Sequence, residues 1–170
     1  MHFTLISFNL LALTSALAFP GSAAPASDVA LQTRQDAPVK PPPCVRKPHT
    51  TEKQTYKRHE AFTRAFVYER DISEAFRYIA KDYINHNPLA KNGSDSAWDL
   101  LSPIWNSQNL TVLRTTFISP QGFLNYKSSF GEVVDRFRWE EGCIAEHWDQ
   151  GEVFPNATNH KSKWTNKAHS

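Results

Sequence analysis

The spacing of hydrophobic residues changes near the middle of this chain. In the first half, apolar side chains recur every three or four residues, which is the period of an amphipathic helix. Residue pairs that form capping boxes, Thr51 with Gln54 and Asp71 with Glu74, precede two of these stripes. The pattern predicts three helices: one over about 51–69, a second from Asp71 that is broken at Asn87-Pro88, and a third from Ser94 through Trp105 with a kink at Ser102-Pro103.

The second half has the alternating, β-branched and aromatic pattern of strands. Residues 110–119 and 123–129 are predicted to be two strands joined by the turn residues Pro120-Gln121-Gly122. Two further runs, 133–139 and 143–149, flank a short acidic loop that ends in glycine, which predicts a hairpin. We therefore expect an α+β fold, with three N-terminal helices packed on one face of a curved, four-stranded antiparallel sheet over residues 50–155.

The register of this hairpin decides which side chains share a face. A three-residue loop, Glu140-Glu141-Gly142, places Asp135 opposite His147, and both then lie on an otherwise apolar face. A two-residue loop, Glu141-Gly142, places Asp135 opposite Trp148 instead. We favour the first register because it separates apolar from ionic residues better, and the second remains open. Since buried ionisable groups are costly unless paired, their presence on an apolar face predicts a working cavity.

The two ends differ in composition from the middle. Residues 1–18 are predicted to be a secretory signal peptide, because an apolar, uncharged run ends in Ala16-Leu17-Ala18. Residues 19–49 hold seven of the eleven prolines and are predicted to be a disordered tail. Residues 156–170 are predicted to be a second, polar tail.

Further features fit a secreted glycoprotein. N-x-[ST] sequons occur at Asn92, Asn109 and Asn156. An oxidising compartment would permit a disulfide between Cys44 and Cys143, the two cysteines of the chain, although two free thiols are the alternative. With a net charge of +2 and no basic stripe, we expect no nucleic-acid partner, and no membrane contact after signal cleavage.

Two motifs, taken together, resemble a known family. The first is Tyr83-Ile84-Asn85-His86-Asn87-Pro88. The second is Val133-Val134-Asp135-Arg136-Phe137-Arg138, followed by an acidic-Gly turn and Ile144-Ala145-Glu146-His147-Trp148-Asp149. In this order they are similar to the SnoaL-like (polyketide cyclase-like) family of the nuclear transport factor 2-like superfamily, over roughly residues 52–155.

The resemblance implies a cone-shaped fold with a hydrophobic pocket between the sheet and the helices, and often a homodimer formed through the sheet. It implies chemistry without a cofactor or metal. By motif position, Asp135 would be the general acid/base, His86 would lie at the pocket wall, and His147 and Asp149 would line the cavity.

These residues leave two alternative functions open. The first is acid–base catalysis (aldol cyclisation, isomerisation or dehydration) on a small polyketide-like carbonyl compound. Asp135 would take a proton α to the carbonyl and His147 or His86 would donate one to the enolate oxygen, inside a pocket walled by Phe137, Trp139, Trp98 and Tyr83. The second is a secreted, non-catalytic protein that binds a small hydrophobic molecule or interacts with a partner. It is suggested by strand 123–129, which has no His where the cyclases carry a second catalytic one.

A metal site made of His86, His147 and Asp149 is a third hypothesis, since two imidazoles and a carboxylate form a common ligand set. We do not favour it, because these residues are far apart in the sequence and relatives of this family generally need no metal.

Overall fold

The computed structural model describes residues 37–129 and 131–156. Its elements, in chain order, are α1 (Glu52–Thr63), the π-helical turn η1 (Arg64–Glu69), α2 (Ile72–Phe76), β1 (Ile79–Asn85), α3 (Ser94–Leu101), the 3₁₀ turn η2 (Trp105–Ser107), β2 (Thr111–Ile118), β3 (Gln121–Ser128), β4 (Gly131–Glu140) and β5 (Cys143–Trp148). None of the helices in this part is long and apolar enough to cross a membrane. The predicted signal peptide, the start of the Pro-rich tail and nearly all of the polar C-terminal tail lie outside the described residues.

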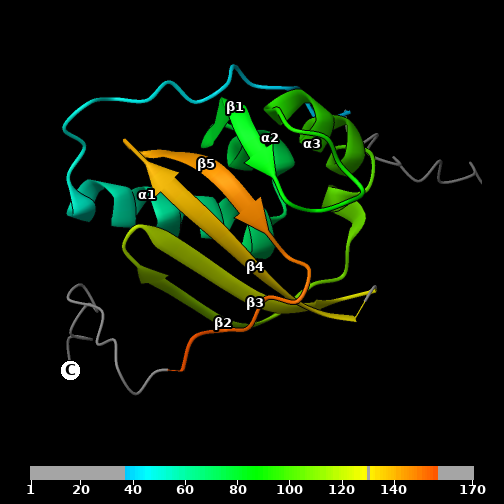
Figure 1. The fold of residues 1–170 in the computed structure, drawn as a ribbon. Helices are drawn as coiled ribbons and strands as arrows, with labels where there is room; N and C mark the ends of the chain where they lie inside the picture. The colour runs from blue at the N-terminus through cyan, green and yellow to red at the C-terminus, as the bar shows by residue number, and fades with distance from the viewer. Residues whose placement is uncertain (1–36, 130, 157–170) are drawn as a thin grey trace, which may run out of the picture. The chain divides into compact units, whose positions relative to one another are not determined.

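A single sheet with the strand order β1-β5-β4-β3-β2 is the centre of the fold. Strands β2 to β5 form an antiparallel meander, and β1 pairs with β5 in parallel. Helices α1 and α2 lie behind the sheet in Figure 1, so one face of the sheet is covered. The predicted α+β class is confirmed, but the prediction of four strands is wrong, because the described chain forms five.

The additional strand comes from the segment predicted as the second helix. Asp71 caps α2 as predicted, since its side chain accepts a hydrogen bond from the backbone N–H of Glu74. The helix then ends at Phe76, and residues 79–85 pair with β5. Ile79, Ala80 and Tyr83 are the buried residues of this strand, and its pairing is irregular between Ile79 and Ile84. This irregular burial imitates the three-to-four spacing of a helix, which explains the error.

The hairpin between β4 and β5 begins in the second register considered above and then departs from both. Glu140 pairs with Cys143 across the two-residue turn Glu141-Gly142, and both turn residues have positive φ, as a type I′ turn requires. The favoured three-residue loop is therefore wrong. A bulge after this first part of the hairpin shifts the register, so that Phe137 lies opposite His147. Because of this shift, His147 still faces the same side of the sheet as Asp135.

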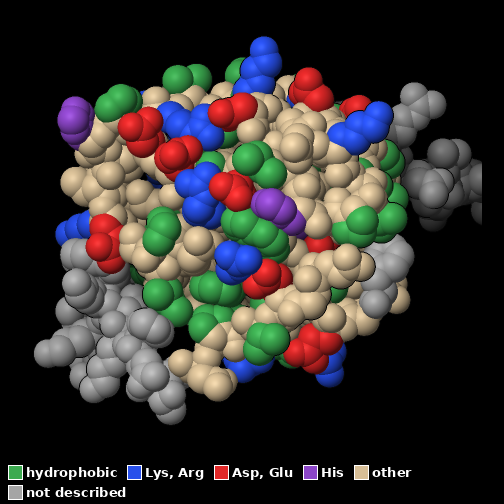
Figure 2. Space-filling model, in the orientation of Figure 1, with side chains coloured by type: hydrophobic (Ala, Val, Ile, Leu, Met, Phe, Trp, Pro, Cys, Tyr) green, Lys and Arg blue, Asp and Glu red, His purple; other side chains and the backbone are tan. Residues whose placement is uncertain are grey.

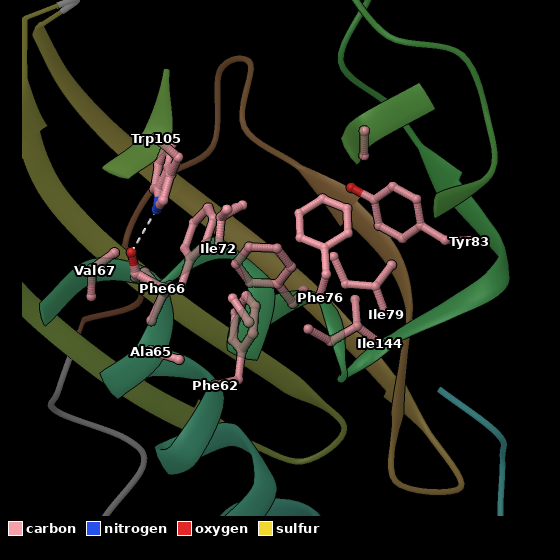
Figure 3. Close-up of a cluster of buried hydrophobic side chains, with 14 of the residues drawn as sticks. Phe62, Ala65, Phe66, Val67, Ile72, Phe76, Ile79, Tyr83, Trp105 and Ile144 are labelled. Carbon is pink, nitrogen blue, oxygen red and sulfur yellow. Dashed lines mark hydrogen bonds between the residues drawn. The ribbon is translucent and has the colours of Figure 1, made fainter. Parts of the chain in front are cut away.

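Aromatic side chains dominate the core between the helices and the sheet. Phe62 stacks on Phe66 at a centroid distance of 5.2 Å, and Phe66 stacks on Trp105 at 4.1 Å. The indole N–H of Trp105 donates to the carbonyl oxygen of Phe66, drawn as the dashed line in Figure 3. Trp105 thus has its polar atom satisfied while it closes one side of the core.

The structure describes the segment before α1 from residue 37, and residues 37–49, predicted as part of a disordered tail, are held against the domain. Cys44 and Cys143 form the predicted disulfide, with 5.8 Å between their Cα atoms. The backbone N–H of Cys44 donates to Ile79, and that of Lys47 donates to Glu141. These contacts hold residues 37–50 along the edge of β1, and the domain begins before residue 50.

The outer face of the sheet carries paired charges. Arg136 binds Glu152 through Nε and Nη2, both at 2.8 Å, and Arg138 binds Glu146 at 2.6 Å. Basic and acidic side chains alternate over this face in Figure 2. Phe154, from the segment after β5, packs under Arg114 with 4.4 Å between the guanidinium and the ring centroid. This segment therefore returns across the outer face, opposite to the helices (Figure 1).

Candidate functional site

A cavity of about 380 Å³ lies between the inner face of the sheet and the helices. This volume lies within the range of small-molecule pockets, roughly 300–1,000 Å³. Its wall is mostly apolar, and aromatic residues of the core, among them Phe62, Phe66 and Trp105, contribute to it. Three lining side chains are also exposed to solvent, which places the mouth of the cavity at Leu89, Leu100 and Ile104.

Polar side chains meet at one part of this wall. Strand β4 supplies Asp135, whose side chain is only 5% exposed. The carboxylate oxygen Oδ2 of Asp135 accepts a hydrogen bond from the hydroxyl of Tyr126 at 2.8 Å, and Oδ1 lies 3.0 Å from Nε2 of His147. The predicted pair of Asp135 and His147 is therefore present in the cavity, although the two residues are diagonal rather than directly opposite.

The tautomer of His147 follows from its other neighbour. Nδ1 of His147 lies 3.3 Å from Oδ1 of Asn85, and this oxygen also accepts from the backbone N–H of Asn87 at 3.0 Å. Since that atom of Asn85 acts as an acceptor, Nδ1 of His147 must carry a proton. Nε2 and the Asp135 carboxyl group then share a single proton, held either on the imidazole or on the carboxyl group.

Asp149 is the third ionisable residue of the cluster. Its Oδ2 accepts from the side-chain amide of Asn87, whereas its Oδ1 is buried and has no hydrogen-bond partner among the described residues. One ligating atom each from Asp135, His147 and Asp149 lies within 4.8 Å of the others. No Lys or Arg is among the described residues that line the cavity.

Two buried tyrosines border the cluster and remain protonated. Burial raises the pKa of Tyr126 well above its ordinary value, and the negative charge of Asp135 and the hydrogen bond to it act in the same direction. Burial likewise raises the pKa of Tyr83, with further contributions from the charges of Asp135 and Asp149. Both phenols are therefore permanent hydrogen-bond donors at neutral pH.

The other predicted site residues divide into two groups. Phe137, Tyr83 and Asp149 line the cavity as expected. Trp98 and Trp139 do not: Trp98 packs against Phe76 in the core, and Trp139 packs beside His59.

His86 does not lie at the pocket wall, which corrects the prediction. Its side chain is 41% exposed, stacks on Trp148 at 4.4 Å, and pairs with Glu146 at 3.2 Å. Because residues 79–85 form a strand, successive side chains there point to opposite faces. Asn85 and Asn87 therefore point to the cavity, while His86 points away from it. The metal set of His86, His147 and Asp149 is not brought together.

Sequence reasoning missed Tyr126, Asn85 and Asn87. Tyr126 lies on β3, the neighbour of β4. Side chains two residues apart on a strand point to the same face, so Tyr126 shares the face of Leu124, which pairs with Asp135. The sequence pattern predicts a helix end at Asn85 and Asn87, where side chains are not expected to alternate between two faces.

Comparisons with known proteins give matches only among solved structures. No protein-family model matches the chain, and no curated protein matches it. The chain is similar to a nuclear transport factor 2-like protein of unknown function from Burkholderia xenovorans, with 15% identity and a TM-score of 0.49 over 69% of this chain and 98% of that one.

The chain is also similar to two further solved structures. A nuclear transport factor 2-like protein from Mesorhizobium loti has 19% identity and a TM-score of 0.47, over 61% of this chain and 94% of that one. A SnoaL-like protein from Burkholderia thailandensis has 8% identity and a TM-score of 0.44, over 58% and 94%. These are likenesses of fold.

Proposed function

We propose that this protein catalyses proton transfer on a small, largely apolar carbonyl compound that enters the cavity past Leu89, Leu100 and Ile104. The observation that carries the proposal is the 3.0 Å contact between Nε2 of His147 and Oδ1 of Asp135 at the wall of an apolar cavity. Such a pair, held in a fixed orientation by Tyr126 and Asn85, is what general acid–base catalysis requires.

The proton balance of the pair fits an enolisation. Asp135 accepts a proton from the carbon next to the carbonyl group, and His147 gives its Nε2 proton to the carbonyl oxygen. The substrate leaves as its enol, and the pair again holds one proton. Tyr126 donates to Asp135 throughout, which keeps the carboxyl group oriented. An enol or enolate is the common intermediate of aldol cyclisation, isomerisation and dehydration, so the same step serves each of these reactions.

Replacing Asp135 by Asn tests the proposal, because Asn cannot accept the proton. With 1-tetralone as the probe, we expect the folded wild-type chain to accelerate exchange of the α-hydrogen for deuterium. The Asp135→Asn variant should lose about 100-fold of this rate, the usual size of a general-base contribution. Nuclear magnetic resonance of the ketone in deuterated water measures the exchange directly.

Two companion variants complete this experiment. Asp99→Asn changes an exposed acid on α3 outside the cavity and should leave the rate unchanged. Tyr126→Phe removes the hydrogen bond to Asp135 and should cost about tenfold, since a positioning group contributes less than the base itself. Equal rates for wild type and Asp135→Asn, with 1-tetralone bound by both, would instead favour the non-catalytic binding protein.

We also propose that the protein is secreted and glycosylated. The disulfide supports an oxidising compartment, and Asn92, Asn109 and Asn156 are all exposed, as glycan attachment requires. Expression in a eukaryotic secretory host should give protein in the medium whose mass falls on treatment with a peptide N-glycosidase. Retention in the cytosol with reduced cysteines would contradict this.

A further inference from the structure

We propose that Asp135, His147 and Asp149 form a binding site for one divalent transition-metal cation in the cavity. The proposal goes beyond the acid–base function, since it adds Asp149, which that function does not use, to the pair of Asp135 and His147. The cation would take the place of the proton that Asp135 and His147 share.

One potential ligand atom from each of the three residues lies close to the other two. Oδ1 of Asp135 lies 3.0 Å from Nε2 of His147, and the three ligating atoms lie within 4.8 Å of one another. Ligand atoms at about 2.1 Å from a metal ion lie roughly 3 Å apart when they are neighbours in the coordination sphere. The cluster thus needs only small side-chain movements to close around a cation.

Each of the three side chains also makes a hydrogen bond to a different residue through an atom other than the one proposed to bind the cation. Tyr126 donates to the second oxygen of Asp135, and Asn87 donates to the second oxygen of Asp149. Asn85 accepts the Nδ1 proton of His147, which leaves Nε2 as the atom that faces the cluster. Outer hydrogen bonds of this kind fix the tautomer and direction of metal ligands.

The cluster lacks a positive charge that balances both carboxylates. Oδ1 of Asp149 is buried without a hydrogen bond, although a buried carboxylate oxygen is expected to have a partner. Two carboxylates face one imidazole, and the described lining of the cavity contains no Lys or Arg. A divalent cation would supply both the missing partner of Oδ1 and the missing positive charge.

The donor set indicates the class of cation. Two carboxylates and one imidazole suit Mn²⁺, Fe²⁺ or Zn²⁺, whereas Mg²⁺ and Ca²⁺ prefer oxygen ligands alone. All three residues line the cavity, so positions facing the cavity would be open to water or to an oxygen atom of a bound molecule.

Isothermal titration of the purified, disulfide-bonded chain with Zn²⁺ and with Mn²⁺ tests the site. We expect one ion per chain, and binding of Mg²⁺ at least about tenfold weaker. Asp149→Asn should weaken binding of Zn²⁺ by more than about tenfold, and Asn87→Ala should weaken it by about tenfold through the loss of support behind Asp149. Asp149→Asn leaves the hydrogen bonds of Asp135 and His147 intact, and circular dichroism verifies its fold.

The matched control is the exposed His86–Glu146 pair, which is the other His–carboxylate contact among the described ion pairs. His86→Gln should leave the affinity for Zn²⁺ unchanged. Loss of binding in His86→Gln but not in Asp149→Asn would locate the ion at the exposed His86–Glu146 pair and overturn the proposal. Absence of a stoichiometric ion in the wild-type titration, or equal affinity for Mg²⁺, would also overturn it. None of these outcomes depends on the rate of α-hydrogen exchange, so the test is separate from that of the proposed function.

Discussion

Replacing both Cys44 and Cys143 by Ala is expected to lower the free energy of unfolding by about 4 kcal/mol. The bridge joins residues 99 positions apart, and a loop of about a hundred residues removes roughly 4–5 kcal/mol of chain entropy from the unfolded state. Ala is preferred to Ser because Cys143 is fully buried and a hydroxyl there would need a partner. Urea denaturation of the two proteins measures the difference.

The oxidised and reduced forms of the wild-type chain provide the control, since they differ in no side chain other than the two thiols. Reduction should give a loss close to that of the double variant. It should also loosen residues 37–50 from β1, because the other ties of this segment include backbone bonds of Cys44 and Lys47 and partly exposed ion pairs of Lys40 and Arg46, and such ion pairs are individually weak. Early proteolysis in this segment after reduction would show it. A loss below about 1 kcal/mol would contradict the prediction.

Local sequence signals predicted the elements that are determined by residues close to one another in the chain. The Thr51–Gln54 capping box is present at the start of α1, and the predicted first helix is found as α1 followed by η1. The third helix ends as α3 and restarts as η2, near the break expected at Ser102-Pro103. Gly142 has the positive φ that the hairpin turn requires. Caps and turns depend on neighbouring residues, which is why one sequence suffices to find them.

Long-range pairing decided the elements that sequence reasoning missed. Residues 79–85 become a strand because β5 offers a parallel partner about 60 residues away, and no local pattern reports that partner. The misplacement of His86 follows from the same error. The hairpin is a different case. The shorter turn and an unforeseen bulge together shift the favoured register by two residues, which returns His147 to the face of Asp135.

The stability of the protein is expected to fall by roughly 3 kcal/mol between pH 7 and pH 4 on account of one residue, His59. Its side chain is 3% exposed and lies over Gly122, where an added Cβ would be 2.4 Å from Nδ1 of His59. Complete burial lowers the pKa of His59 from 6.5 to about 4, against a smaller opposing effect of a backbone hydrogen bond at Thr116. The imidazole is therefore neutral in the folded protein near pH 5.

The direction follows from the proton counts of the two states. Between pH 6.5 and about 4 the unfolded chain binds a proton at His59 that the folded chain does not bind, so acid favours unfolding throughout this window. Each pH unit within this window lowers the free energy of unfolding by about 1.4 kcal/mol, and above pH 6.5 the protonation of His59 no longer lowers it.

Urea denaturation from pH 7 to pH 4 should show this slope in the wild type and a shallower one in His59→Leu. His49→Asn, a change at an exposed His, should keep the wild-type slope. Equal slopes for the wild type and His59→Leu would show that His59 is protonated in the folded state, and its burial would then not control the acid stability.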